Sequence, residues 1–185
     1  MSRLRRLVLS NRFFFVTCRL FHNRRILSES ELDCLAQAMS ARRKIHGFLI
    51  TSWVLLPGHW HAILYPHHPL TISNVMESIK VSSTRQINRR RSESGLLWQG
   101  RFFDHAVRTA KEYHETVEYI HGNPVKAGLV TRPEDWPWSS ANDASVAQSL
   151  RPSNSAALGP AKPIPTKSAL VIDQVVLPMD PRARI

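Results

Sequence analysis

At 185 residues the chain has the length of one domain with an appendage, and its apolar fraction of 43% suffices for a packed core. The formal net charge of +11 favours a polyanionic partner, most simply nucleic acid. No stretch approaches the roughly 20 apolar residues of a transmembrane helix, and no signal-peptide cleavage site follows the basic N-terminus. Cys18 and Cys34 belong to no Cys/His array, which argues against structural zinc and fits a reducing compartment. We therefore expect a cytoplasmic protein with no membrane partner.

The predicted elements alternate between strands and helices along the first 140 residues. Aromatic and β-branched residues predict a strand over 13–21, and Ser28 with Glu31 forms a capping box that opens a helix over 28–44. Two strands over 48–55 and 59–65 flank a Pro57-Gly58 turn, and a second helix covers 71–91. The aromatic segment 98–107 is expected to be extended. A third helix covers 111–122 and is expected to end at Asn123-Pro124, because a residue before proline avoids the helical region.

This order, β-α-β-β-α-β with an added C-terminal helix, predicts an α+β fold, namely a ferredoxin-like or RRM-like sandwich. Residues 1–140 are expected to form the domain. Residues 141–185 are rich in Ala, Ser and Pro and predict a disordered or loosely docked tail, with one short strand at most, over 169–177.

Two histidines in the strand 59–65 are candidate metal ligands. Side chains alternate along a strand, so His59 and His61 point to the same face. Neutral imidazole is a common ligand for divalent metals. The alternative is an ordinary pair of hydrogen-bonded strand residues, and the spacing alone does not separate the two interpretations.

The third predicted helix supplies a candidate nucleophile. Tyr119 and Asn123 are four residues apart and share one helical face. A tyrosine brought to a metal held by the histidines can attack a phosphodiester, with Asn123 as a third ligand. The alternatives are packing of Tyr119 against the sheet and helix termination at Asn123. Tyr113, six residues earlier, lies on a different face and is a poor substitute.

Basic and aromatic side chains mark a candidate nucleic-acid surface. Cations of the second predicted helix and of the segment after it are candidates for phosphate contacts: Lys80, Arg85, Arg89, Arg101 and Arg108. Trp98, Phe102 and Phe103 interleave with Arg101, and exposed rings of this kind stack on single-stranded bases. The same rings are equally consistent with core packing.

Three motifs in this order resemble the IS200-like single-tyrosine HUH transposases, and within them the REP-associated tyrosine transposases. The resemblance spans roughly residues 10 to 140, and Asp135-Trp136-Pro137-Trp138-Ser139-Ser140 closes it. The motifs are Trp53-Val54-Leu55-Leu56-Pro57-Gly58-His59-Trp60-His61, Leu97-Trp98-Gln99-Gly100-Arg101-Phe102-Phe103-Asp104-His105-Ala106-Val107-Arg108 and Tyr119-Ile120-His121-Gly122-Asn123-Pro124-Val125-Lys126-Ala127-Gly128-Leu129-Val130. Gly58 departs from relatives, which often carry Asn or Glu there; it loosens the turn and removes no ligand.

The resemblance implies an enzyme that binds REP-type DNA hairpins and cuts and rejoins single-stranded DNA. His59 and His61 would hold Mg²⁺ or Mn²⁺ on the scissile phosphate, and Tyr119 would form a 5′-phosphotyrosine and release a 3′-hydroxyl. The protein would act as a monomer or a homodimer. Two other hypotheses remain at this point: a domesticated nucleic-acid-binding module without turnover, and an unrelated metal hydrolase that uses the histidine pair with Asp104 and His105.

Overall fold

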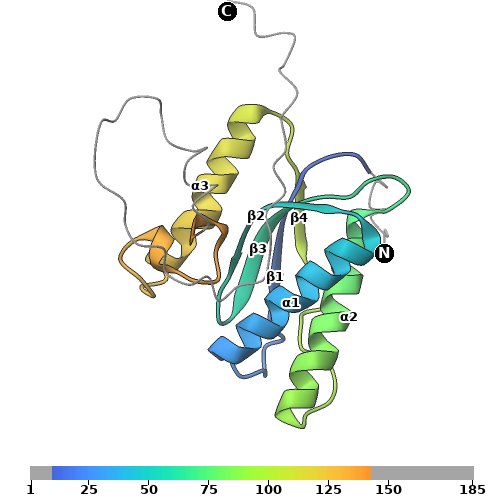
Figure 1. Cartoon of the computed structure of the whole chain (residues 1–185), viewed down its shortest axis with the longest axis vertical. Coiled ribbons are helices and arrows are strands. Elements are labelled where there is room, and N and C mark those ends of the chain that lie inside the picture. Colours follow the sequence, from blue (N-terminus) through green and yellow to red (C-terminus); the bar gives the residue numbers. More distant parts are fainter. Residues whose placement is uncertain (1–9, 143–185) are drawn as a thin grey trace, which may run out of the picture.

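The computed structural model describes residues 10–142, which fold into one antiparallel sheet with helices on both faces (Figure 1). Two 3₁₀ turns follow the last helix. The strands are β1 (Phe14–Arg19), β2 (Leu49–Leu55), β3 (His59–Tyr65) and β4 (Phe103–Ala106); the helices are α1 (Glu29–His46), α2 (Ile72–Arg91) and α3 (Ala110–Lys126); the 3₁₀ turns are η1 (Pro133–Asp135) and η2 (Ser140–Asn142).

The strand order β2-β3-β1-β4 confirms the predicted ferredoxin-like topology. Each half of the fold is a β-α-β unit in which the helix crosses the sheet, β1-α1-β2 and β3-α2-β4. Figure 1 shows α1 and α2 side by side over one face of the sheet, while α3 stands apart from them. The first strand in the sequence therefore lies at the centre of the sheet, between β3 and β4.

Alternation along the strands divides the core between the two faces. Toward α1 and α2, Val16 and Trp60 pack with helix residues such as Leu35 and Ile79 and with Trp98. Toward α3, a smaller cluster joins strand residues to the helix: Val54, Leu56, Ile63, Val117 and Ile120. Among residues 10–142, this smaller cluster covers only the part of the second face that lies against α3.

Local sequence signals account for the ends of α1 and α2. The backbone amide of Ser28 donates to the Glu31 carboxylate at 2.8 Å, which confirms the predicted capping box. Gly47 ends α1 with φ of 70°, a left-handed conformation that glycine adopts without steric cost. Thr71 caps α2 by accepting from the backbone amide of Asn74 at 3.2 Å.

The predicted end of the third helix was wrong, because α3 continues through Pro124 to Lys126. Pro124 is buried at the end of the helix with Ile120 and His121. The amide Nδ2 of Asn123 donates to the backbone carbonyl of Tyr119 at 2.7 Å. Packing and this side-chain bond hold the last turn in helical geometry despite the local preference of a residue before proline. Asn123 therefore lies inside the helix, one turn after Tyr119.

The extended segment predicted over 98–107 contains less strand than expected. Trp98 forms an isolated bridge with Leu20, and regular pairing with β1 is confined to Phe103–Ala106. The part before β4 is loop, which Lys80 of α2 contacts at Gln99 and Gly100. The predicted tail 141–185, apart from its first two residues, and its strand over 169–177 lie outside the described residues.

The segment after α3 fastens that helix to the sheet. Ser139 bridges to Val54, and the indole of Trp136 donates to the carbonyl of Leu55 at 2.9 Å. Ser140 Oγ lies 2.7 Å from His121 Nε2 on α3 and accepts from the amide of Trp53 at 3.0 Å. The motif that closes the family resemblance thus covers the outer edge of β2 and links it to α3.

Between residues 10 and 142 the structure contains no helix that combines the length and apolar character needed to cross a membrane.

Candidate active site on the open face of the sheet

The two predicted histidine ligands lie next to each other on the sheet face that carries α3. β3 directs its buried apolar residues Trp60, Ala62 and Leu64 toward α1 and α2, so His59 and His61 face the other way. Their ring centroids are 4.9 Å apart and the rings meet edge to face. The arrangement agrees with the prediction that the pair shares one face.

His61 has one nitrogen engaged and one left over. Thr17 on β1 lies directly opposite, and its hydroxyl is 2.8 Å from His61 Nδ1. The other nitrogen, Nε2, is buried and has no hydrogen-bond partner among the described residues. A buried polar atom without a partner costs free energy unless a ligand satisfies it. This orphaned nitrogen fits a metal ion.

Burial keeps both imidazoles in the neutral form that binds metals. Burial, the charge of His59 and that of Arg19 lower the pKa of His61 from 6.5 to about 3. Burial and Arg19 also lower the pKa of His59 below its usual value. Arg19 pairs with His59 across β1 and β3, so a guanidinium lies beside the histidines. At neutral pH each ring offers a lone pair.

Tyr119 projects from α3 over the same open face. Its neighbours Val117 and Ile120 are buried against the sheet, which fixes the rotation of the helix. The Tyr119 ring lies 5.5 Å from the His61 ring and 5.8 Å from Phe15, which stacks on His61. The tyrosine is 43% exposed, although its ring contacts the sheet. The structure thus brings together the predicted nucleophile and the predicted ligands.

Tyr113 has a different environment, as its helical position suggests. Its ring packs edge to face against Phe13 at 5.3 Å, beside the small apolar cluster. Burial raises the pKa of Tyr113 above its usual value. These contacts describe a packing residue.

Within the described ranges no group of three or more His, Cys, Asp or Glu side chains is arranged to hold a metal. A third protein ligand beside His59 and His61 would therefore be of another type. The Asn123 amide donates from Nδ2 to the Tyr119 carbonyl, and its oxygen is not used in that bond. Asn123 as a ligand stays a prediction.

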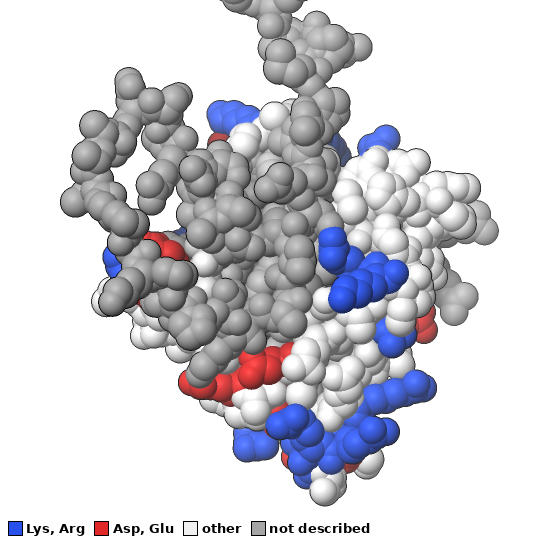
Figure 2. Space-filling view, in the orientation of Figure 1, with Lys and Arg blue, Asp and Glu red and all other residues white. Residues whose placement is uncertain are grey.

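The predicted phosphate-binding cations lie mostly on the surface. Figure 2 shows lysine and arginine side chains gathered where α2 ends. Arg85, Arg89, Arg101 and Arg108 are exposed. Lys80 instead donates to the carbonyls of Gln99 and Gly100 at 2.7 and 2.9 Å, which ties α2 to the loop before β4. Its ammonium is already engaged, so it is less available for phosphate than the four arginines.

The prediction of Trp98 as a base-stacking residue was wrong, and the alternative of core packing holds for it. Trp98 is 2% exposed, packs against Trp60, and donates from its indole to Ser83 Oγ at 2.9 Å. Phe103, in contrast, is 56% exposed and lies on β4 opposite Thr17, on the face that carries the histidines. The exposed ring beside the site is therefore Phe103.

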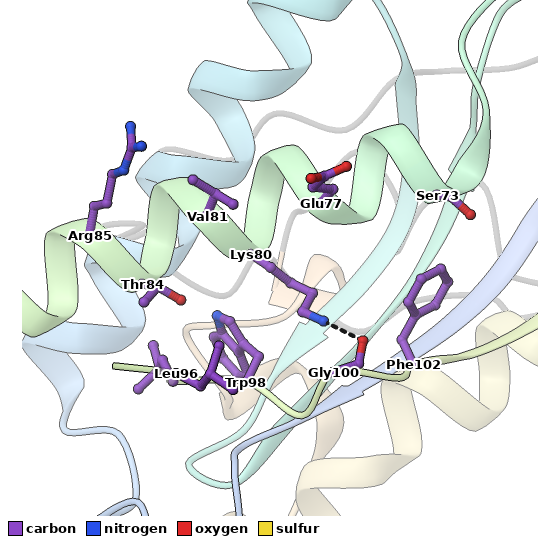
Figure 3. Close-up of a pocket in the computed structure, with 11 residues that line it drawn as sticks. Ser73, Glu77, Lys80, Val81, Thr84, Arg85, Leu96, Trp98, Gly100 and Phe102 are labelled. Carbon is purple, nitrogen blue, oxygen red and sulfur yellow. Dashed lines mark hydrogen bonds between the residues drawn. The ribbon is translucent and has the colours of Figure 1, made fainter. Parts of the chain in front are cut away.

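A cavity of about 500 Å³ lies between α2 and the loop before β4 (Figure 3). Lys80 and Arg85 border it together with Val81, Leu96 and Phe102. Since α2 covers the face opposite the histidines, this cavity is separate from the candidate active site. The cavity is partly lined by apolar side chains and lies among the predicted DNA-binding residues.

Sequence reasoning missed Thr17, Phe15 and Arg19. All three belong to β1, about forty residues before the histidines, and reach them only through the register of β1 with β3. No spacing in the sequence gives that register. The alternation along β1 indicates that these residues share a face. It does not indicate which residues of the neighbouring strand they contact.

Comparison with known proteins agrees with this geometry. The family described as "Transposase IS200 like" matches residues 13–123. A REP-associated tyrosine transposase of Escherichia coli K12 is 33% identical over 153 residues, which cover 82% of this chain and 89% of the relative. A Haemophilus influenzae relative described as a putative REP-associated tyrosine transposase is 32% identical over 96 residues, 46% of this chain and 54% of the relative.

A solved structure is similar to this one in fold. It is a REP-associated tyrosine transposase bound to a REP hairpin, with 28% sequence identity and a TM-score of 0.70, and the match covers 96% of this chain and all of that one. The fold, the histidine pair facing a tyrosine and the family match agree with one another. The chain belongs to the IS200-like transposases, in the branch of the REP-associated tyrosine transposases.

Proposed function

We propose that this transposase binds hairpin DNA and cuts and rejoins one strand through Tyr119, with a divalent metal held by His59 and His61. The observation that carries the proposal is the meeting of Tyr119 with His61, whose Nε2 is buried and has no partner in the described part of the chain. The hairpin bound in the related solved structure supports the choice of DNA substrate. The exposed arginines around α2 and β4 supply the positive surface that phosphates require.

The roles of the residues follow from their positions. Tyr119 Oη attacks the phosphorus, the bond from phosphorus to the 3′ oxygen breaks, and the strand remains joined to the protein as a 5′-phosphotyrosine. The phenolic proton is released and the 3′ oxygen takes up a proton, so that a later attack by a 3′-hydroxyl reverses the step. Thr17 fixes the orientation of His61, and Phe15 supports both His61 and Tyr119.

His59 and His61, with Asn123 as the third ligand, would hold Mg²⁺ or Mn²⁺. When bound, such an ion would supply Lewis-acid stabilisation of the charge on the phosphate. The neutral imidazoles are ready to bind without first releasing a proton.

A cleavage assay tests this proposal. Purified protein is mixed with a labelled single strand that contains the palindrome flanking its own gene, in Mg²⁺, Mn²⁺ or EDTA. We expect a metal-dependent nick and a covalent protein–DNA adduct. Tyr119→Phe should abolish both and leave hairpin binding intact, whereas the matched control Tyr113→Phe should keep both. Tight binding without a nick or adduct in either metal would favour a binding module without turnover.

A further inference from the structure

Lys126 places a positive charge directly over the tyrosine. It lies in the last turn of α3, seven residues after Tyr119, so the two residues share a helical face two turns apart. Its ammonium nitrogen is 5.0 Å from the centroid of the Tyr119 ring. Side chains on a helix point toward its N-terminus, so the four-carbon stem of Lys126 runs back along α3 to the ring.

Gly122 leaves the path of this side chain open. It lies on the same face, three residues after Tyr119 and four before Lys126. A Cβ atom added at Gly122 would lie 4.0 Å from Lys126 Cε, at ordinary contact distance. The lysine stem therefore runs past Gly122, which adds no side chain of its own beside it.

The interactions that a lysine usually makes at the end of a helix do not explain why the Lys126 ammonium lies over the Tyr119 ring. Lysines there commonly neutralise the last carbonyls. In α3 the backbone amides that follow already donate to those carbonyls, from Ala127 to Asn123 and from Leu129 to Pro124. Within residues 10–142 no ion pair involving Lys126 is formed. The ammonium instead lies over the ring of the nucleophile.

We propose that Lys126 is a further catalytic residue, which contacts the phosphate that Tyr119 attacks; this inference rests on the function proposed above. The phosphate that enters at Tyr119 carries negative charge, and the charge is spread over its oxygens as the bond to Tyr119 Oη forms and the bond to the 3′ oxygen breaks. A flexible ammonium with three donors can leave the ring face and bind a non-bridging oxygen. In the absence of DNA, the ring holds the cation in place.

Arg19 supplies a cation from the sheet beside His59, whereas Lys126 is the cation that the helix carries at the nucleophile itself. Lys126 and Tyr119 belong to the same helix, so the charge and the nucleophile are positioned by one element. Preorganised charge at the reacting phosphate acts on the rate of the chemical step more than on binding of the hairpin.

Single-turnover cleavage at saturating DNA, measured together with the hairpin Kd, tests the inference. We expect Lys126→Gln to lower the cleavage rate constant about 10²-fold and to change Kd less than about threefold. Lys126→Arg should recover part of the rate. The matched control is Lys111→Gln, which removes an equal charge from the exposed start of the same helix, where Lys111 pairs with Glu115 across 3.8 Å. It should cleave at the wild-type rate.

Chemical rescue separates a role of the charge from a structural role. Lys126→Cys alkylated with 2-bromoethylamine restores an amine of nearly the original length, and the native thiols of Cys18 and Cys34 are buried. Recovery of the rate supports the inference. Cleavage by Lys126→Gln at the wild-type rate overturns it, as does a slow variant that alkylation fails to rescue. Failure of the wild-type protein itself to cleave would refute the proposed function.

Discussion

We expect His121, which lies on α3 behind the active site, to make a large contribution to the loss of folding stability at acidic pH. It is 8% exposed, and its Nε2 lies 2.7 Å from Ser140 Oγ and 3.3 Å from Ser52 Oγ. Burial lowers the pKa of His121 from 6.5 to about 4. The folded protein therefore keeps this ring neutral in a pH range where the unfolded chain protonates it.

The sign and size of the effect follow from these two values. As pH falls below 6.5, His121 becomes protonated in the unfolded state, but in the folded state it stays neutral until about pH 4. The free energy of unfolding therefore falls between these two pH values. Between pH 7 and pH 5 the contribution of His121 amounts to about 2 kcal/mol of lost stability. A glutamine at this position keeps a hydrogen-bonding group near Ser140 and cannot titrate.

Urea unfolding in EDTA at pH 7 and pH 5 measures this contribution. His121→Gln should lose about 2 kcal/mol less than the wild type on acidification, because the other histidines are common to both proteins. His114→Gln, at an exposed position on the same helix, is the control and should follow the wild type. An equal loss of stability in the wild type and His121→Gln would refute the assignment of a neutral, buried His121.

Three further predictions concern the site and its support. Thr17→Val removes the hydroxyl that orients His61 and should weaken Mn²⁺ binding at least tenfold in a metal titration; unchanged affinity would contradict the role of Thr17. Trp98→Phe loses the bond to Ser83 and should lower the free energy of unfolding by about 1 kcal/mol with unchanged hairpin affinity; weaker DNA binding by the folded variant would restore the stacking role. The side chain of Arg91 is 1% exposed and donates two hydrogen bonds to Glu31, at 2.6 and 2.8 Å. Arg91→Leu should lower the free energy of unfolding in urea by about 3–5 kcal/mol, whereas Arg89→Leu should change it by less than about 0.5 kcal/mol and weaken DNA binding. Similar stabilities of the two variants would count against the buried pair.

The parts of the fold that were predictable are those that local pattern determines. The capping box at Ser28 and the alternation over 59–65 located their elements, and β3 begins and ends as expected. The end of α3 was missed because burial of Pro124 outweighs the backbone preference of Asn123, and burial is a property of the assembled fold. Predictions failed where contacts distant in sequence override local preference.

The same distinction applies to the site. His59, His61 and Tyr119 were identified from residue type, from spacing and from the family resemblance, and the structure places His61 beside the other two. Trp98 was misassigned because an aromatic next to arginines has the same sequence pattern in a core and in a nucleic-acid surface. Its partner Ser83 is fifteen residues away on α2, and only the packing of that helix decides between the two interpretations.

The fastening of α3 by the segment that follows it has a consequence for synthesis on the ribosome. The strands that carry His59, His61 and Arg19 emerge well before the nucleophile, and the nucleophile emerges before Trp136 and Ser140, whose bonds connect its helix to β2. Domains fold as their residues become available. A nascent chain stopped short of Ser140 would therefore present a paired histidine site without a firmly attached tyrosine. The attachment of the nucleophile's helix to the sheet is therefore complete only after Trp136 and Ser140 have been made.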